Sequence, residues 1–232
     1  MPNLQGFEAQ LLAGAVVTLE LALLAMACAI LIGLVFATAK GSTIPPLRWI
    51  ATAYTTAIRG LPELLIILLV YFSASAVART VAGWFGYTGY IDVSAFTAGV
   101  IALAIAYGAY ATEVFRGAIR AIPQGQIEAA QALGMTRWQT FRRILLPQLW
   151  RLTLPALGNL FQSLLKDTAL VSVIGAQDLM RETSIAVGYT REPFTFYFAA
   201  ALIYLTLTAI CTIGVYALER WAGRGHEGSA GA

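Results

Sequence analysis

The sequence predicts an all-α integral membrane protein, and three observations support that prediction. Hydrophobic residues make up 59% of the 232-residue chain and charged residues only 12%, about half the charged fraction of a soluble globular domain. The mean hydropathy is +0.72. The apolar residues also gather into five long blocks, and a helix that crosses a bilayer needs roughly 20 such residues.

The predicted membrane helices follow one another along the chain. They cover approximately residues 11–39, 53–78, 95–114, 154–174 and 194–218. Pro62 interrupts the second block, and the Lys166–Asp167 pair interrupts the fourth. Because we find no internal repeat or low-complexity tract, we expect one membrane domain over residues 1–232. The opening MPNLQGFEAQ has no basic segment of the signal-peptide type, so we expect the first helix to be retained.

The distribution of basic residues predicts the orientation. Only Arg79, Arg181 and Arg191 fall on one side of the predicted membrane. The other side collects Lys40, Arg48, Arg116, Arg120, Arg137, Arg142, Arg143, Arg151, Arg220 and Arg224. Since basic loops stay in the cytoplasm, the side with the larger set is expected to be cytoplasmic. Five spans then put the N-terminus outside and the C-terminus inside. The segment 120–150 then lies in the cytoplasm.

Several other functions find no support in the sequence. The net charge of +3 comes without the clustered basic and aromatic residues of a nucleic-acid site. Cys28 and Cys211 both lie in apolar blocks, which disfavours a disulfide framework. The GxGxxG at Gly223–Gly228 follows a membrane helix rather than a strand, and His226, the only histidine, has no metal-ligand partners nearby. No Walker A, CxxC, HExxH or GxSxG motif occurs, so we expect neither ATP hydrolysis by this chain nor a bound metal or cofactor.

The cytoplasmic segment has a readable local chemistry. Residues 126–133 suit a short helix that ends at Gly134, a residue that accepts a left-handed backbone. Thr136 and Gln139 fit a capping box that starts a second short helix, which is expected to end before Pro147. An apolar face is expected along the pair from Ala129, Ala130, Leu133, Trp138, Phe141 and Ile144. Such a surface suits either a lipid interface or a partner's groove.

Glu128-Ala129-Ala130 is followed by Gly134 and then, after nine intervening residues, by Ile144, Leu146 and Pro147. This spacing resembles the EAA signature of ABC importer permeases. Further stretches resemble the polar amino-acid permeases, closest to the histidine/lysine-arginine-ornithine and octopine/nopaline branch. These stretches are GAVVTLEL (Gly14–Leu21), RGLPEL (Arg59–Leu64), YGAYATEVFRG (Tyr107–Gly117), LKDTALVS (Leu165–Ser172), EPF (Glu192–Phe194) and LER (Leu218–Arg220).

The resemblance implies a type I ABC importer permease fold with five transmembrane helices, in a bacterial inner membrane. It implies that a cytoplasmic ATPase dimer, which holds ATP and Mg, docks on the 120–150 loop. The coupling residues would be Glu128, Ala129, Ala130, Gly134, Arg137 and Phe141. It also implies a second permease subunit, in a heterodimer or a homodimer. A periplasmic or lipid-anchored binding protein would touch residues 83–92 and 177–193.

Ionisable residues inside membrane helices are candidates for substrate contact, because each costs roughly 2.5 kcal/mol or more to insert. We expect Glu63, next to the helix break at Pro62, to face a cavity, although an ion pair with Arg59 is an alternative. Asp167 is a second candidate carboxylate. Lys166 suits a substrate carboxylate or a structural pair with Glu113 or Glu20.

The third predicted helix carries further candidates. Glu113 is either a substrate contact or the partner of Arg116 three residues on. Tyr107 offers a hydroxyl and an aromatic ring, with core packing as the alternative; Tyr110 and Thr112 offer hydroxyls. Glu20, alone in the first helix, is a candidate subunit contact.

Charge suggests the substrate class. Glu63 and Asp167 with Lys166 as counter-charge complement an amino acid that has two positive groups and one negative. We therefore expect import of basic amino acids such as arginine, lysine, ornithine or histidine, or of opines. Import of glutamine or of other neutral or acidic polar amino acids is the alternative. A proton-coupled secondary transporter that uses Glu20, Glu113 and Asp167 as a relay is a further one.

Overall fold

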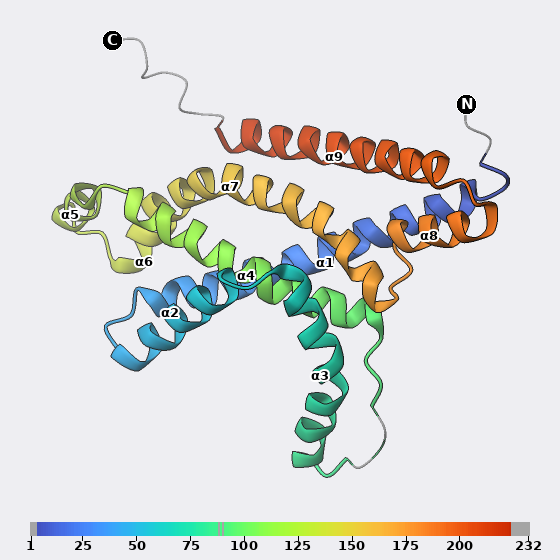
Figure 1. Ribbon diagram of the computed structural model, residues 1–232. Coiled ribbons are helices and arrows are strands. Elements are labelled where there is room, and N and C mark those ends of the chain that lie inside the picture. Colours follow the sequence, from blue (N-terminus) through green and yellow to red (C-terminus); the bar gives the residue numbers. More distant parts are fainter. Residues whose placement is uncertain (1–3, 88, 90, 224–232) are drawn as a thin grey trace.

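The computed structural model describes residues 4–87, 89 and 91–223, and regular structure in these residues is entirely helical (Figure 1). The helices are α1 (Glu8–Lys40), α2 (Pro45–Arg59), α3 (Glu63–Trp84), α4 (Ala95–Ala121), α5 (Gln124–Ala132), α6 (Arg137–Thr140), a π-helical turn η1 (Phe141–Leu145), α7 (Leu146–Asp167), a 3₁₀ helix η2 (Thr168–Ile174), α8 (Leu179–Thr190) and α9 (Pro193–Gly223). Within these residues α1, α3, α4 and α9 are long and apolar enough to cross a membrane.

Helix α4 lies at the centre of the bundle, with α1 packed along it. Small residues let the two backbones approach closely, as is usual between membrane helices. A Cβ atom built on Gly33 would lie 2.7 Å from the Cβ of Ala111, and one built on Gly108 would lie 2.6 Å from Cγ2 of Ile32. The remaining faces of α4 contact α2, α3 and α7.

The second predicted block is two helices rather than one. Helix α2 ends at Arg59 and α3 begins at Glu63, with Pro62 in an extended conformation at φ −60° and ψ 138°. The interruption predicted at Pro62 is therefore confirmed, and the two helices together extend beyond the predicted limits of residues 53–78. Proline has no backbone N–H and its ring excludes the helical carbonyl four residues earlier, so the chain starts a new helix after it. In Figure 1, α3 projects away from the rest of the bundle.

The fourth block also differs from its expected limits. Helix α7 starts at Leu146, eight residues before the predicted start, and gives way to η2 directly after Asp167. By length and composition, α7 is not among the candidate membrane helices of the described chain. The charged pair Lys166–Asp167 thus lies where the α-helical pattern changes to the tighter 3₁₀ pattern.

Most of the local structure predicted for the 120–150 segment is confirmed. Gly134 has φ +75°, and the Thr136–Gln139 capping box forms. The predicted end of the second short helix before Pro147 is wrong, because α6 continues through η1 into α7. The N–H of Leu146 bonds to the carbonyl of Phe141 across the π turn. Pro147 therefore lies in the first turn of α7, where a missing N–H is tolerated.

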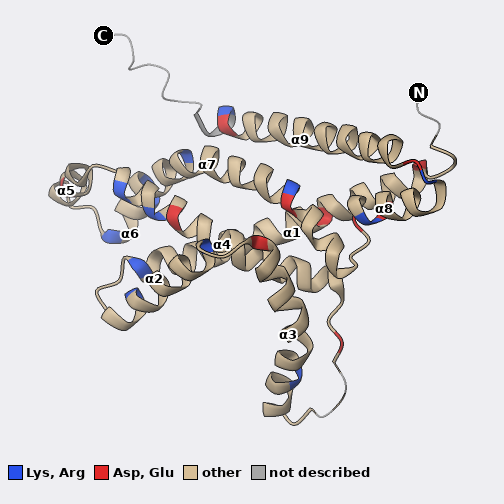
Figure 2. Cartoon of the chain, in the orientation of Figure 1, with Lys and Arg blue, Asp and Glu red and all other residues tan. Residues whose placement is uncertain are grey.

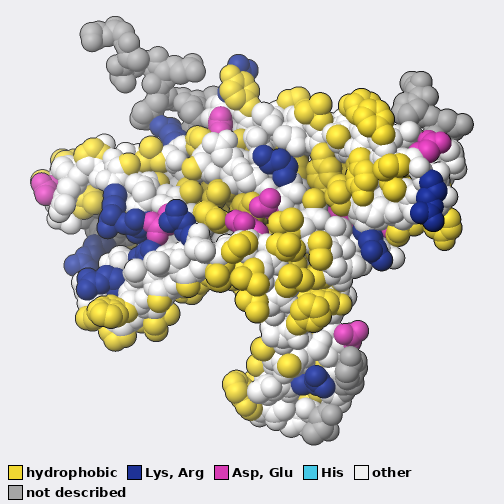
Figure 3. Space-filling view, viewed as in Figure 1, with side chains coloured by type: hydrophobic (Ala, Val, Ile, Leu, Met, Phe, Trp, Pro, Cys, Tyr) yellow, Lys and Arg dark blue, Asp and Glu magenta, His cyan; other side chains and the backbone are white. Residues whose placement is uncertain are grey.

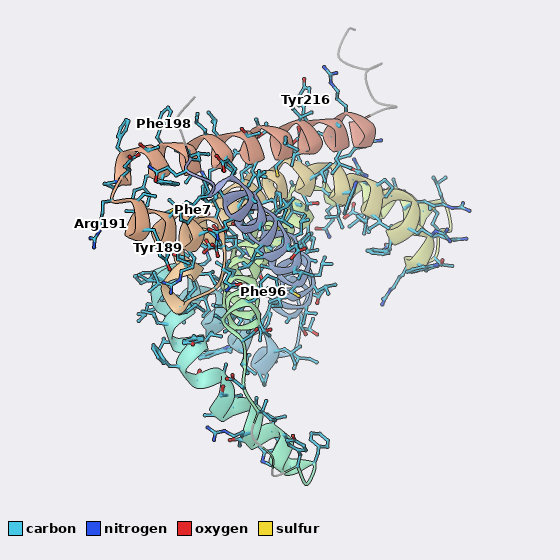
Figure 4. All side chains as sticks on the ribbon, turned by 90° about the vertical axis from the view of Figure 1, so that its right-hand side faces the viewer. Phe7, Phe96, Tyr189, Arg191, Phe198 and Tyr216 are labelled. Atoms are coloured by element: carbon cyan, nitrogen blue, oxygen red, sulfur yellow. The ribbon has the colours of Figure 1, made fainter. Side chains whose placement is uncertain are left out.

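Exposed side chains show which faces lack a neighbour in this chain. The apolar windows of α3 and α9 are each only 11% buried. In Figure 4, Phe198 and Tyr216 point away from the bundle on α9, whereas Phe7 lies beside Tyr189 of α8 with ring centroids 6.2 Å apart.

Basic side chains gather at the end of the molecule that carries α2, α5 and α6 (Figure 2).

Candidate functional site

A cavity of about 360 Å³ opens among α3, α4 and α7. Its lining residues are Glu63, Tyr107, Tyr110, Leu160, Ser163, Lys166 and Asp167. Acidic side chains are visible near the centre of the face shown in Figure 3, among apolar ones. Four of the five residues predicted to contact substrate are thus brought together from three helices, the exception being Glu113.

Two tyrosines of α4 hold the two carboxylates. The hydroxyl of Tyr107 donates to Oδ2 of Asp167 at 2.7 Å, and the hydroxyl of Tyr110 donates to Oε1 of Glu63 at 3.1 Å. Tyr107 and Tyr110 share one face of α4 because they are three residues apart. Tyr107 is also buried, with 3% of its surface exposed, so it combines the core and site roles between which the sequence left a choice.

The helix break places Glu63 in the cavity. Glu63 is the first residue of α3, and the dipole of that helix favours a negative charge at its N-terminus. Arg59 is the last residue of α2, and the dipole of α2 favours a positive charge at its C-terminus. An ion pair between Arg59 and Glu63, the alternative that the sequence left open, does not occur among the described residues. Instead, the Arg59 guanidinium lies 5.5 Å from the centroid of the Tyr110 ring.

Lys166 is an exposed ammonium group at the cavity wall. It forms no ion pair within the described part of the chain, so the alternative of a structural pair with Glu113 or Glu20 is not realised in this structure. Asp167 is half-buried beside it. The cavity therefore presents two carboxylates that accept tyrosine hydrogen bonds and one ammonium group without a carboxylate partner.

Glu113 lies outside this cavity, which corrects the expectation that it joins Glu63 and Asp167. Its carboxylate pairs with Lys40 through one oxygen and with Arg116 at 2.6 Å through the other. The predicted alternative, a pair with Arg116, is confirmed. The contact with Lys40 was not foreseen, because 73 residues separate the two partners. Glu20 is exposed on α1 and does not line the cavity either.

Sequence reasoning missed two residues of the cavity wall. Ser163 and Leu160 lie four and seven positions before Asp167 on α7, and both line the cavity. Residues at this spacing share one face of a helix, so the same 3.6-residue periodicity that located the helix also points to them. Neither residue is ionisable, which is why a search for buried charges passed over them.

The 120–150 segment forms an exposed knob at one end of the molecule (Figure 1). Leu133 and Trp138 are 82% and 65% exposed, and the Trp138 and Phe141 rings stack with centroids 5.8 Å apart. Of the residues predicted to couple to a partner, Ala130 is buried and packs inside the knob. The others are exposed, namely Glu128, Ala129, Gly134, Arg137 and Phe141.

Comparison with known proteins assigns the family. The pattern of the binding-protein-dependent transport system inner membrane component matches residues 16–224. The chain belongs to this family. A nopaline transport system permease protein of Agrobacterium fabrum is 46% identical over 95% of this chain and 94% of its own length. A histidine/lysine/arginine/ornithine transport system permease protein of Salmonella typhimurium is 46% identical over 94% and 95%.

The chain also matches a solved structure. The crystal structure of an amino acid ABC transporter with histidines is 39% identical, with a TM-score of 0.77 over 91% of this chain and 94% of that one. The family resemblance read from the EAA spacing is thereby confirmed, as is the all-helical permease fold. The chain is a transport subunit of this kind rather than an enzyme, as its relatives are.

Proposed function

We propose that this chain is the permease subunit of an ATP-driven importer and forms the translocation pathway for basic amino acids or opines derived from them. The relatives with 46% identity transport nopaline or histidine, lysine, arginine and ornithine, according to their names. The observation that carries the proposal for this chain is the pairing of Glu63 and Asp167 in one cavity.

The cavity suits a cationic side chain because it holds one more carboxylate than ammonium group. Glu63 and Asp167 each accept a tyrosine hydrogen bond that keeps the carboxylate in place without neutralising it. A guanidinium or ammonium group between them gains charge-assisted hydrogen bonds, which are about twice as strong as neutral ones. Lys166 supplies the positive charge for the substrate carboxylate, and the Tyr107 hydroxyl orients Asp167.

The proposed assembly places the chain in a bacterial inner membrane with the N-terminus outside and the C-terminus in the cytoplasm. Five spans are formed by α1, the broken α2–α3 pair, α4, α7 with η2, and α9. A second, homologous permease subunit covers the exposed apolar faces of α3 and α9, most simply in a heterodimer. A binding protein outside the cell delivers substrate to the segments around residues 83–92 and 177–193.

Transport energy comes from a separate ATPase dimer that holds ATP and Mg. We assign its docking to the knob, where Gly134 permits the turn and Arg137 and Phe141 are exposed. Exposed apolar side chains on a cytoplasmic surface otherwise carry a solubility cost, which a partner's groove removes. ATP-driven movement of the ATPases then moves the knob and switches the cavity between outward and inward access.

The test uses the complex purified through a tag on this chain and reconstituted in liposomes with its binding protein. ATP hydrolysis is measured against cationic, neutral and acidic amino acids. Stimulation by arginine, lysine, ornithine or histidine alone is expected. Stimulation by glutamine or glutamate instead would retain an importer and overturn the substrate class, and absence of an ATPase from the purified complex would overturn the coupling role.

A further inference from the structure

A second cavity of about 460 Å³ lies next to the first, toward the end of the molecule that carries the knob. Its polar lining comes from Lys40, Arg59, Tyr110, Glu113 and Arg116. Lys40 is the last residue of α1 and Arg59 the last of α2, while Arg116 lies near the end of α4. Three helix ends therefore bring basic side chains to one hollow.

The second cavity has a net positive charge. The Glu113 carboxylate is already shared between Lys40 and Arg116, and the three side chains are only 11%, 18% and 31% exposed for Lys40, Glu113 and Arg116. Arg59 has no carboxylate within ion-pair distance in the described chain, and its guanidinium rests on the Tyr110 ring. Its N–H donors remain available to an added anion.

The two cavities adjoin at Tyr110 of α4. Tyr107, Tyr110, Glu113 and Arg116 follow at intervals of three residues on α4. Each step advances about 4.5 Å along the helix axis and turns about 60° around it, so this row of side chains winds around the helix. Tyr107 lines the first cavity, Glu113 and Arg116 line the second, and Tyr110 lines both. A molecule that leaves the first cavity past Tyr110 therefore enters the second.

We propose that this second cavity is an inner binding station for the carboxylate of the transported amino acid, with Arg59 as its principal donor. The proposal rests on the proposed function and adds a step to it. The carboxylates of the first cavity select the cationic side chain. The basic station then takes the opposite end of the same molecule and repels its side chain, so binding there is weak and favours release.

Equilibrium binding to the complete complex of permease subunits and ATPase tests this, without binding protein or nucleotide. Radiolabelled arginine is the probe, and agmatine, which has the same guanidinium but no carboxylate, is the competitor. The double variant Glu63→Gln/Asp167→Asn disables the first cavity. It is expected to retain weaker arginine binding that agmatine does not displace, whereas agmatine displaces arginine from the unmodified complex.

Adding Arg59→Gln to the double variant is expected to weaken the residual binding by at least about tenfold, because charge-assisted hydrogen bonds are lost. Arg59→Lys is expected to restore part of it. Arg48→Gln is the matched control, since Arg48 lies on the same helix but lines a different pocket. Recovery of the ATPase with the tagged chain, together with a single peak in gel filtration, identifies variants that fold and assemble.

Three results would overturn the station: no residual binding in the assembled double variant, residual binding unaffected by Arg59→Gln, or displacement by agmatine. A fourth would be loss of residual binding in nanodiscs that contain phosphatidylglycerol, which would assign the cavity to a lipid phosphate. Failure of the proposed function is a different result. In that case the unmodified complex binds a neutral amino acid in place of arginine, and the station is tested with that amino acid, whose carboxylate is the same.

Discussion

Arg59 and Glu63, the last residue of α2 and the first of α3, both contact Tyr110 of α4. The guanidinium lies 5.5 Å from the ring centroid, and the carboxylate accepts the Tyr110 hydroxyl at 3.1 Å. In a continuous helix Arg59 and Glu63 would lie one turn apart and would pair. The break between α2 and α3 separates them. Each charge is consequently left to face its own cavity.

Neutralising Glu63 is expected to weaken transport of cationic substrates selectively. Glu63→Gln keeps an oxygen that accepts the Tyr110 hydrogen bond but removes the charge. Arginine uptake into proteoliposomes should show a KM raised by about tenfold or more, since a charge-assisted hydrogen bond is worth about 1.5–3 kcal/mol. Glu8→Gln, at an exposed carboxylate in the first turn of α1, is the control. Unchanged uptake in Glu63→Gln would remove Glu63 from the substrate site.

Removing the Tyr107 hydroxyl is expected to destabilise the empty cavity. Tyr107→Phe keeps the buried ring but takes the donor from Asp167, at a cost of about 1–3 kcal/mol. The complex should melt at a lower temperature without substrate, and saturating arginine should recover part of the loss. Tyr71→Phe serves as the comparison, because no hydrogen bond from the Tyr71 hydroxyl occurs among the described residues. Equal melting of Tyr107→Phe and unmodified protein would contradict the role of this bond.

Gly134 is expected to be required for coupling. Its φ of +75° costs a residue with a Cβ about 1–2 kcal/mol, so Gly134→Ala should distort the turn between α5 and α6. ATP-driven uptake and recovery of the ATPase with the tagged chain should both fall. Gly125→Ala is a matched control in the same segment, because Gly125 is in a helix and an added Cβ meets nothing within 4 Å. Loss of coupling in both variants alike would refute the conformational explanation.

Asp178 is expected to make stability depend on pH. Burial raises the pKa of this carboxyl from 3.8 to about 6, against the opposing effect of the backbone N–H groups of Arg181 and Met180. The folded protein holds this proton more tightly than the unfolded chain does. Stability therefore falls as pH rises from about 4 to about 6 and levels off above that.

Asp178→Asn tests this dependence, because asparagine still accepts the N-cap hydrogen bonds of α8 but does not titrate. Melting temperatures from pH 4 to pH 8 should give a flatter profile for the variant. Asp178→Ala, which also loses the cap, should be less stable than Asp178→Asn by about 1 kcal/mol at every pH. Parallel profiles for the unmodified protein and Asp178→Asn would show that Asp178 does not titrate in this range.

Local features could be predicted from the sequence to within a few residues. The limits of the first apolar block, the starts of the third and fifth, the left-handed turn at Gly134 and the Thr136–Gln139 capping box all depend on residues close together in the chain. The prediction failed where two local patterns compete. Pro147 favoured a helix end because proline lacks a backbone N–H, whereas the apolar residues around it favoured a continuous helix. The chain continues there through a π turn.

By itself, the sequence determined that this protein is a helical membrane component with a segment that has the EAA spacing, because helix length, turn chemistry and motif spacing are local quantities. Only the tertiary structure decided which charges share a cavity. Tyr107 and Asp167 are 60 residues apart, and Tyr110 and Glu63 are 47 apart. The same holds for Glu113, which pairs with Lys40 outside the cavity that holds Glu63 and Asp167. Such pairings depend on how α1, α3 and α7 pack against α4, and packing is a property of all the helices together.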